Sequence, residues 1–189
     1  MNQTSITPYF VFTQTQKRFG YVWFVFQQLS HYCGIYPFFN VSAPYGSNGN
    51  RYYFMQVRTR SYPIMLTLYD MFYTVTNKKA VKTINYGLLS YLDDIALAYW
   101  AMDDGAWTKS GFYLHTPCPR RGGTKGFTFL EVYRLIALLH YKFSLVCSVQ
   151  DHDGRPVIYI KVESMNLFRS LVTPHFHPTM MYKLRQNAS

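Results

Sequence analysis

The sequence predicts an α+β protein built from two similar halves. Residues 9–75 have the order strand, helix, hairpin, helix, and residues 107–173 have the same order. Single positions echo between the halves, as His31 does with His140. Hydrophobic residues make up 49% of the 189 residues and the mean hydropathy is −0.11. These values indicate a globular protein with enough chain for one substantial core or two smaller ones.

The elements of the first half follow from residue type and hydrophobic period. Aromatic and β-branched residues favour strands, and turn-forming residues at 43–50 favour a hairpin. Val22, Phe26 and Cys33 recur at helical spacing. The predicted elements are a strand at 9–16, a helix at 18–33, hairpin strands at 35–42 and 51–60, and a helix that begins at Ser61 and Pro63.

The second half repeats this order after a connector and one additional helix. Thr128 and Glu131 form a T-x-x-E capping box, which is typical of a helix start. An Asp-Gly turn near residue 154 predicts the hairpin. The predicted elements are a connector at 77–91, a helix at 92–104, a strand at 107–116, a helix after Thr128, hairpin strands at 144–150 and 156–162, and a helix from Ser164 to Thr173-Pro174.

The additional helix carries the most unusual local pattern in the chain. Ser90 and Asp93 form an S-x-x-D signal that predicts Ser90 as the N-cap, and Gly105 is predicted as the left-handed residue that closes the helix. Asp104 would then lie at the C-terminal end, where the helix dipole favours cations. A solvated helix end is the ordinary explanation, and a bound divalent cation is the functional one.

The charge distribution indicates a polyanionic partner. The net charge is +10 and the pI is near 9.5. The residues up to Tyr91 include eight Lys and Arg but a single acid, Asp70. Nucleic acid is the commonest polyanion that such a surface binds. Three scattered cysteines predict neither a disulfide framework nor a zinc site, and no membrane span or signal peptide is expected.

Residues 97–105, Leu-Ala-Tyr-Trp-Ala-Met-Asp-Asp-Gly, resemble the motif of the LAGLIDADG homing endonucleases and maturases in its organellar form. The segment 171–184, which ends in Met-Met-Tyr-Lys-Leu, resembles the closing segment of the same family. The resemblance implies a homing-endonuclease-like pseudo-two-fold repeat of α-β-β-α-β-β-α units with saddle-shaped antiparallel sheets. It further implies a truncated N-terminal half at 1–76 that lacks its opening helix, a connector at 77–91 and a C-terminal half at 92–189.

The resemblance also implies the chemistry of the site. The acid immediately before glycine would bind Mg²⁺, so Asp104, with Gly105 beside it, is the expected metal-binding and catalytic position. Lys161 is the second catalytic candidate, because relatives place a basic residue on a late strand near the scissile phosphate. A plain phosphate contact or a solvated lysine is the alternative for Lys161. Ala98 and Ala101 lie one turn apart and would form the interface with a partner helix.

The strand faces and basic segments supply the expected nucleic-acid contacts. Gln and Arg side chains at alternating strand positions can read base edges in the major groove, whereas other Lys and Arg residues would contact phosphates. Tyr113, His115 and Tyr159 are weaker candidates in the second half. The expected contacts are Gln14, Gln16, Lys17, Arg51, Gln56, Arg58, Arg60, Lys109, Arg120, Arg121, Lys125 and Lys161.

Two functions on this scaffold remain open. The first is an intron-encoded DNA endonuclease. The second is an inactive RNA-binding protein, namely an intron maturase or a mitochondrial ribosome-associated protein. Cutting both strands needs two acids, and the expected first acid is absent from this sequence. Three explanations stay open: Met1 lies within a longer reading frame, a second polypeptide supplies the missing helix, or two copies of the chain pair. The many Tyr and Phe residues have AT-rich codons, which favours an organellar, for example mitochondrial, gene.

Overall fold

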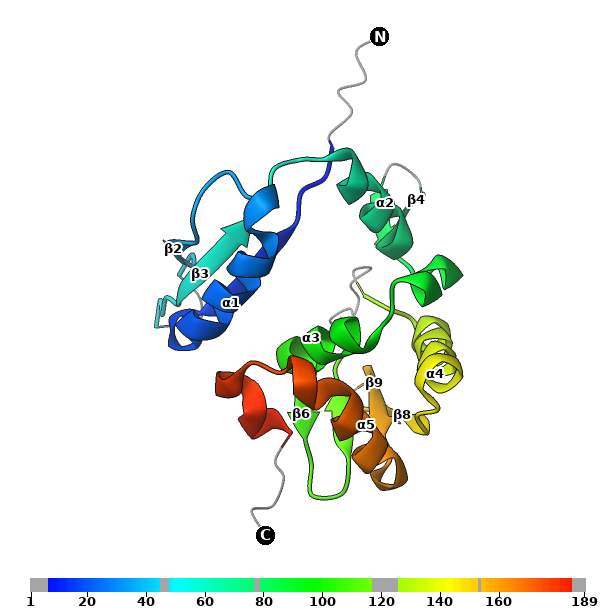
Figure 1. Cartoon of the computed structure of the whole chain (residues 1–189). Helices are drawn as coiled ribbons and strands as arrows, with labels where there is room; N and C mark the ends of the chain where they lie inside the picture. The colour runs from blue at the N-terminus through cyan, green and yellow to red at the C-terminus, as the bar shows by residue number, and fades with distance from the viewer. Residues whose placement is uncertain (1–6, 45–47, 77–78, 117–125, 153, 185–189) are drawn as a thin grey trace. The chain divides into compact units, whose positions relative to one another are not determined.

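The structure is a computed structural model that describes residues 7–44, 48–76, 79–116, 126–152 and 154–184 (Figure 1). The chain divides into two compact units, Met1–Tyr69 and Asp70–Ser189, and each is described by itself. Within the described residues, no helix has both the length and the apolar composition needed to cross a membrane.

Unit 1 contains a three-stranded antiparallel sheet covered on one face by a helix. The strands β1 (Val11–Thr15), β2 (Phe38–Val41) and β3 (Tyr53–Arg58) lie in the order β1-β3-β2. Helix α1 (Phe19–Leu29) packs against β1 and β3. Helix α2 (Pro63–Phe72) follows β3 and spans the boundary between the units.

Alternation along the strands of unit 1 separates its core from an open face. Met55 and Val57 are buried, and Phe12, opposite Val57, contacts the ring of Tyr21 on α1 edge-on. The intervening residues of β3 point to the other face, because successive side chains of a strand alternate. This unit therefore has one apolar face under α1 and an opposite face that carries the alternate residues of β3.

Unit 2 has the same arrangement of elements, preceded in the sequence by an additional helix and strand. Its main sheet has the order β6-β7-β9-β8, so β7-β9-β8 repeats the order β1-β3-β2. The described part of unit 1 has no counterpart of α3 and β6 before β1. The strands are β6 (Gly105–Trp107), β7 (Phe112–Leu114), β8 (Cys147–Asp151) and β9 (Pro156–Ile160), and the helices are α3 (Asp94–Asp104), α4 (Phe129–Phe143) and α5 (Met165–Val172).

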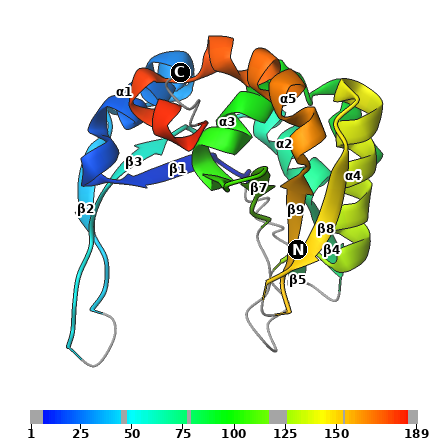
Figure 2. The same cartoon turned by 90° about the horizontal axis from the view of Figure 1, so that it is seen from below.

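The helices of unit 2 cover one face of its sheet. Helix α4 runs alongside β8 and β9, as Figure 2 shows, and α3 packs against α5. Phe112 and Ile160 are fully buried between the sheet and the helices, and the Phe112 ring lies 4.8 Å from the Phe168 ring. The predicted capping box starts α4, because Thr128 caps the Glu131 N–H and Glu131 binds back to Thr128.

A second, two-stranded sheet lies at the beginning of unit 2. Strand β4 (Tyr73–Thr76) pairs with β5 (Lys79–Lys82), and β5 lies within the segment at 77–91 that is expected to connect the halves. Short 3-10 turns complete the unit: η3 (Tyr86–Ser90), η4 (Val162–Ser164), η5 (Thr173–His175) and η6 (Pro178–Lys183). In unit 1, η1 (Gln16–Arg18) and η2 (Ser30–Tyr32) flank α1.

Three local predictions were wrong. Asp93, not Ser90, is the N-cap of α3, since its side chain accepts from the Ala96 N–H while Ser90 ends η3. Gly105 is extended, with φ −82° and ψ 147°, rather than left-handed. The single strand expected at 107–116 is a hairpin of β6 and β7, because the Thr108 side chain closes a turn at Gly111.

Candidate active site and nucleic-acid interface

Asp104 ends the motif helix at a point where three elements meet. The Gly105 N–H donates to the Ala101 carbonyl and closes α3, and the chain continues directly into β6. The His115 N–H donates to the Asp104 carbonyl over 2.9 Å and fixes this backbone beside the end of β7. The Asp104 side chain is exposed, so its carboxylate is available to a ligand.

Lys183 supplies the cation that the end of α3 requires. Its side chain is 8% exposed, and its Nζ donates to the Asp103 carbonyl over 3.0 Å. A positive charge there is favourable because the helix dipole leaves partial negative charge on the last carbonyls. The same charge acts on Asp104 and partly offsets the desolvation that raises the pKa of its carboxyl.

Lys82 and His115 complete the charged surroundings of Asp104. Desolvation raises the pKa of Asp104, and the charges of Lys183, His115 and Lys82 each lower it in part. Desolvation and the charge of His152 lower the pKa of His115, and the charge of Asp104 partly offsets this effect. The Lys82 Nζ lies 5.8 Å from the centre of the Phe127 ring, which orients it by a cation–π contact.

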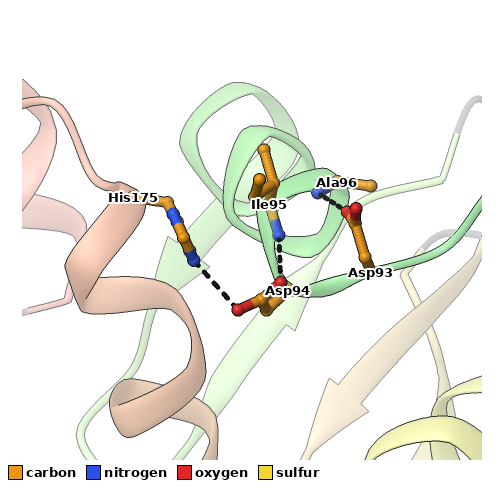
Figure 3. A network of polar contacts seen from close by, with 5 residues as sticks. All are labelled: Asp93, Asp94, Ile95, Ala96 and His175. Atoms are coloured by element: carbon orange, nitrogen blue, oxygen red, sulfur yellow. Dashed lines mark hydrogen bonds and ion pairs between the residues drawn. The ribbon is translucent and has the colours of Figure 1, made fainter.

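The start of α3 is tied to the segment that leads to Lys183. Asp94 accepts from the Ile95 N–H and lies 3.0 Å from Nε2 of His175 in η5, as Figure 3 shows beside the Asp93 cap. The hydrogen bond to His175 is the main cause that lowers the pKa of Asp94. The His177 N–H donates to the Met102 sulfur, so the C-terminal segment contacts α3 at more than one point.

The other three sequence candidates for the motif region lie in different surroundings. Lys161 is exposed after β9, and its charge acts on the Cys147 thiol, whose pKa burial raises to about 12. The charges that shift Asp104 come from other residues. Ala98 and Ala101 are fully buried, on a helix whose contacts in unit 2 include α5 and η5. Their role as an interface with a second motif helix stays a prediction.

The open face of the unit 1 sheet carries part of the expected interface. Gln56 and Arg58 point to it, and the Gln56 amide donates to the Thr13 hydroxyl over 3.3 Å. The Arg58 guanidinium lies over the Tyr9 ring at 4.1 Å. Gln14 is opposite Met55 in the register, so it lies on the face toward α1. The structure therefore groups Thr13, rather than Gln14, with Gln56 and Arg58.

The remaining basic and amide candidates lie at the ends of strands. Gln16 and Lys17 belong to η1, after β1 ends, and Arg51 precedes β3. Arg60 follows β3 and its side chain lies against Gly34. Lys109 is exposed in the turn between β6 and β7. Arg120, Arg121 and Lys125 lie outside the described residues.

The open face of the unit 2 sheet is aromatic and polar. Tyr113 and Tyr159 are paired across β7 and β9 with their rings 5.2 Å apart. The Tyr113 hydroxyl donates to the Gln150 amide oxygen over 2.5 Å, and the Tyr159 hydroxyl lies 3.1 Å from that of Ser110. These contacts hold the polar groups of both tyrosines in place on this face.

Comparison with protein families shows which family the chain belongs to. The model of the LAGLIDADG DNA endonuclease family matches residues 2–168, which is most of the chain. The chain belongs to the LAGLIDADG family. The α+β fold expected from the motif is confirmed, since the structure of the homing endonuclease I-WcaI bound to its DNA recognition sequence superposes with a TM-score of 0.80. The two chains are 28% identical, and the match covers all of this chain and 80% of the other.

Relatives of this LAGLIDADG protein include both endonucleases and maturases. The intron-encoded endonuclease ai4 of Dictyostelium discoideum is 37% identical over 137 residues, which are 71% of this chain and 77% of that protein. The probable intron-encoded DNA endonuclease 3 of Mycosarcoma maydis is 32% identical over 67% of this chain and 90% of its own length. The cytochrome b mRNA maturase bI2 of Saccharomyces cerevisiae is 28% identical over 92% of this chain and 41% of that protein.

Asp104, the acid of the LAGLIDADG motif, thus lies among basic groups. Two of these groups, Lys82 and Lys183, are not among the site residues predicted from the sequence. Lys82 lies in the predicted connector, and Lys183 lies 80 residues beyond the Asp103 carbonyl that it contacts. The available signal for Lys183 was its position in the closing segment beside buried Met180 and Leu184, where a lysine needs a partner. For Lys82, no local pattern distinguishes it from the basic residues around it.

Proposed function

We propose that this LAGLIDADG protein is a site-specific, intron-encoded DNA endonuclease with Asp104 as a metal ligand. The observation that carries the proposal is the exposed Asp104 carboxylate with Lys82, Lys183 and His115 acting on it. A single acid among basic groups is suited to a phosphodiester and a metal ion together. The DNA-bound I-WcaI structure and the two relatives named as endonucleases support the same function.

The donor set at Asp104 fits a divalent cation that shares its ligands with the substrate. Endonucleases of this family generally use a divalent metal ion. Mg²⁺ binds through one or two carboxylates together with water and phosphate oxygens. Within the described residues no three His, Cys, Asp or Glu side chains come together to hold a metal, so Asp104 would bind the ion together with water and phosphate oxygens. Asp104 would hold the ion, which would supply polarisation of the phosphate and a lowered pKa for a bound water molecule.

The remaining groups of the site act on charge and position. Lys183 and Lys82 favour the ionised form of Asp104, which is the form that binds a cation. Their ammonium groups would also stabilise the negative charge that develops on the phosphate. Gln56 and Arg58 in unit 1, with Tyr113 and Gln150 in unit 2, would contact bases and phosphates on the open sheet faces.

The proposal is tested by cleavage of a target from which the intron is absent. Purified protein is incubated with Mg²⁺ and a library of intron-less organellar junction sequences, and products are mapped by sequencing. Double-strand cuts at one defined junction support the function. Cuts that occur equally without divalent cation, or at unrelated sequences alone, contradict it.

Replacement of Lys183 is expected to lower cleavage strongly. In Lys183→Met the methionine keeps the apolar stem but removes the ammonium beside Asp104. We expect the single-turnover rate to fall about 10²-fold, the usual effect of removing one preorganised electrostatic donor. A gel-shift titration measures whether the affinity for the target DNA stays unchanged. Lys142→Met is the control, because Lys142 is exposed on α4, and this variant should cut at the wild-type rate.

RNA binding as a maturase is the second candidate function. It is favoured by the match of 92% of this chain to the maturase bI2. On this alternative the protein retains its intron RNA, and affinity falls about 10³-fold between about 50 and 200 mM salt if about six phosphates are contacted. Filter binding to the structured intron at several salt concentrations measures the slope. Absent or salt-insensitive binding contradicts a maturase role.

The names of the relatives bear on where the gene resides. Two of them describe intron-encoded endonucleases, and a third describes a maturase of the cytochrome b mRNA. We infer an organellar intron as the origin of this chain, with the mitochondrion as the proposed compartment.

A further inference from the structure

Arg169 connects two segments that flank the candidate site. It lies on α5, and its guanidinium carbon is 4.8 Å from the centre of the Trp107 ring. Its Nε donates to the Leu184 carbonyl over 3.2 Å. Trp107 comes three residues after Asp104 on β6, and Leu184 directly follows Lys183. Arg169 therefore contacts both β6, the strand that follows Asp104, and the backbone next to Lys183.

The segment that carries Lys183 needs such an anchor. Residues Pro178–Lys183 form the 3-10 turn η6, and Leu184 caps its end. The hydrogen bonds of 3-10 helices are poorly aligned, so short turns of this kind hold their geometry weakly by themselves. Lysine adds a flexible four-carbon stem, and its ammonium must reach the Asp103 carbonyl. The Leu184 carbonyl, one residue away, is the point at which Arg169 fixes this backbone.

We propose that Arg169 is a positioning residue, which holds the Lys183 ammonium beside Asp104 by binding the Leu184 carbonyl and the Trp107 ring together. Arginine suits both contacts, because its planar guanidinium stacks on an aromatic ring through its face and donates within its plane. Lysine ends in a compact ammonium group and has no planar group that could stack on the ring. The effect of Arg169 on catalysis rests on the function proposed for Asp104 and Lys183. Its effect on the position of Lys183 does not depend on that function.

Chemical labelling tests the position of Lys183 without any assay of activity. The Lys183 side chain is 8% exposed, so reductive methylation of its amine is expected to be slow in the wild type. In Arg169→Ala we expect the labelling of Lys183, quantified by peptide mass spectrometry, to become several-fold faster, with a smaller increase in Arg169→Lys. Arg134→Ala is the matched control, because Arg134 also lies over a ring, that of Tyr86, at 5.7 Å.

Unchanged labelling of Lys183 in folded Arg169→Ala overturns the proposal. Circular dichroism establishes whether each variant is folded. If Arg169→Ala does not fold, Arg169→Gln removes the cationic stacking group with less loss of volume and is judged by the same criterion. If the wild-type protein cuts no DNA but Lys183 is labelled faster in Arg169→Ala, the endonuclease function is contradicted. The role of Arg169 in positioning Lys183 is then still supported.

A double-mutant cycle tests the catalytic consequence. We expect Arg169→Ala to lower the single-turnover cleavage rate about 10- to 100-fold, as small misplacements of catalytic groups do, with the dissociation constant for DNA unchanged. In the Lys183→Met background, Arg169→Ala should cause no further loss, because it acts through the absent ammonium. Fully additive losses would show that Arg169 acts by another route and overturn its positioning role.

Discussion

Asp104→Asn is expected to abolish DNA cleavage while target binding stays within about twofold of the wild type. The substitution keeps the size of the side chain but removes the negative charge that binds a divalent cation. Loss of about 4 kcal/mol of transition-state stabilisation corresponds to a rate decrease of about 10³-fold. Single-turnover cleavage with Mg²⁺ measures the rate, and gel shift in Ca²⁺ measures binding.

Asp94→Asn is the control for this experiment. It makes the same chemical change at the other end of the same helix, where Asp94 pairs with His175. Both groups are partly exposed, and exposed pairs contribute little to stability, so cleavage should remain close to the wild-type rate. Cleavage that survives in Asp104→Asn would remove this residue from the proposed mechanism.

The basic groups around Asp104 also affect the pKa of its carboxyl. The net effect of burial and of the neighbouring cations is a pKa above the ordinary value of aspartate. A raised pKa means that protons compete with a cation for this carboxylate more strongly than they do at an ordinary aspartate. The charges of Lys183 and Lys82 limit that competition, which gives these lysines a function even before a phosphate binds.

The sequence predicted those parts of the fold that depend on local patterns. The capping box of Thr128 and Glu131 and the repeated order of strands and helices are confirmed, because adjacent residues determine them. The choice between Ser90 and Asp93 as N-cap failed, since both residue types cap helices and only the path of η3 into α3 decides between them.

Contacts over long sequence distances could not be predicted in the same way. Lys183 reaches the end of α3 across 80 residues, and no spacing rule connects the two. Gln14 fits a base-reading residue by type, but the pairing register sets it opposite Met55 and toward α1. A side chain changes face with each step along a strand, so residue type without register assigns the wrong face about as readily as the right one.

Gly105→Ala is expected to destabilise unit 2 severely. A Cβ at this position would lie 2.2 Å from the Ala101 carbonyl oxygen and 2.4 Å from the Phe112 ring. The carbonyl belongs to the last turn of α3, and Phe112 is fully buried, so neither can move away without disturbing the core. We expect a loss of about 3 kcal/mol or more in the free energy of unfolding. Urea denaturation followed by circular dichroism measures it.

Gly87→Ala is the matched control for this substitution. A Cβ there would be 3.4 Å from the Asn85 side-chain oxygen, which is ordinary contact, so the change should stay within about 0.5 kcal/mol. Equal stability of the two variants would contradict the close packing at Gly105. The glycine that ends the motif is thus required by the space between α3 and β7, not by a left-handed backbone. Since this packing sets where β6 begins, it also fixes Asp104 at the junction of helix and strand where Lys183 and His115 act on it.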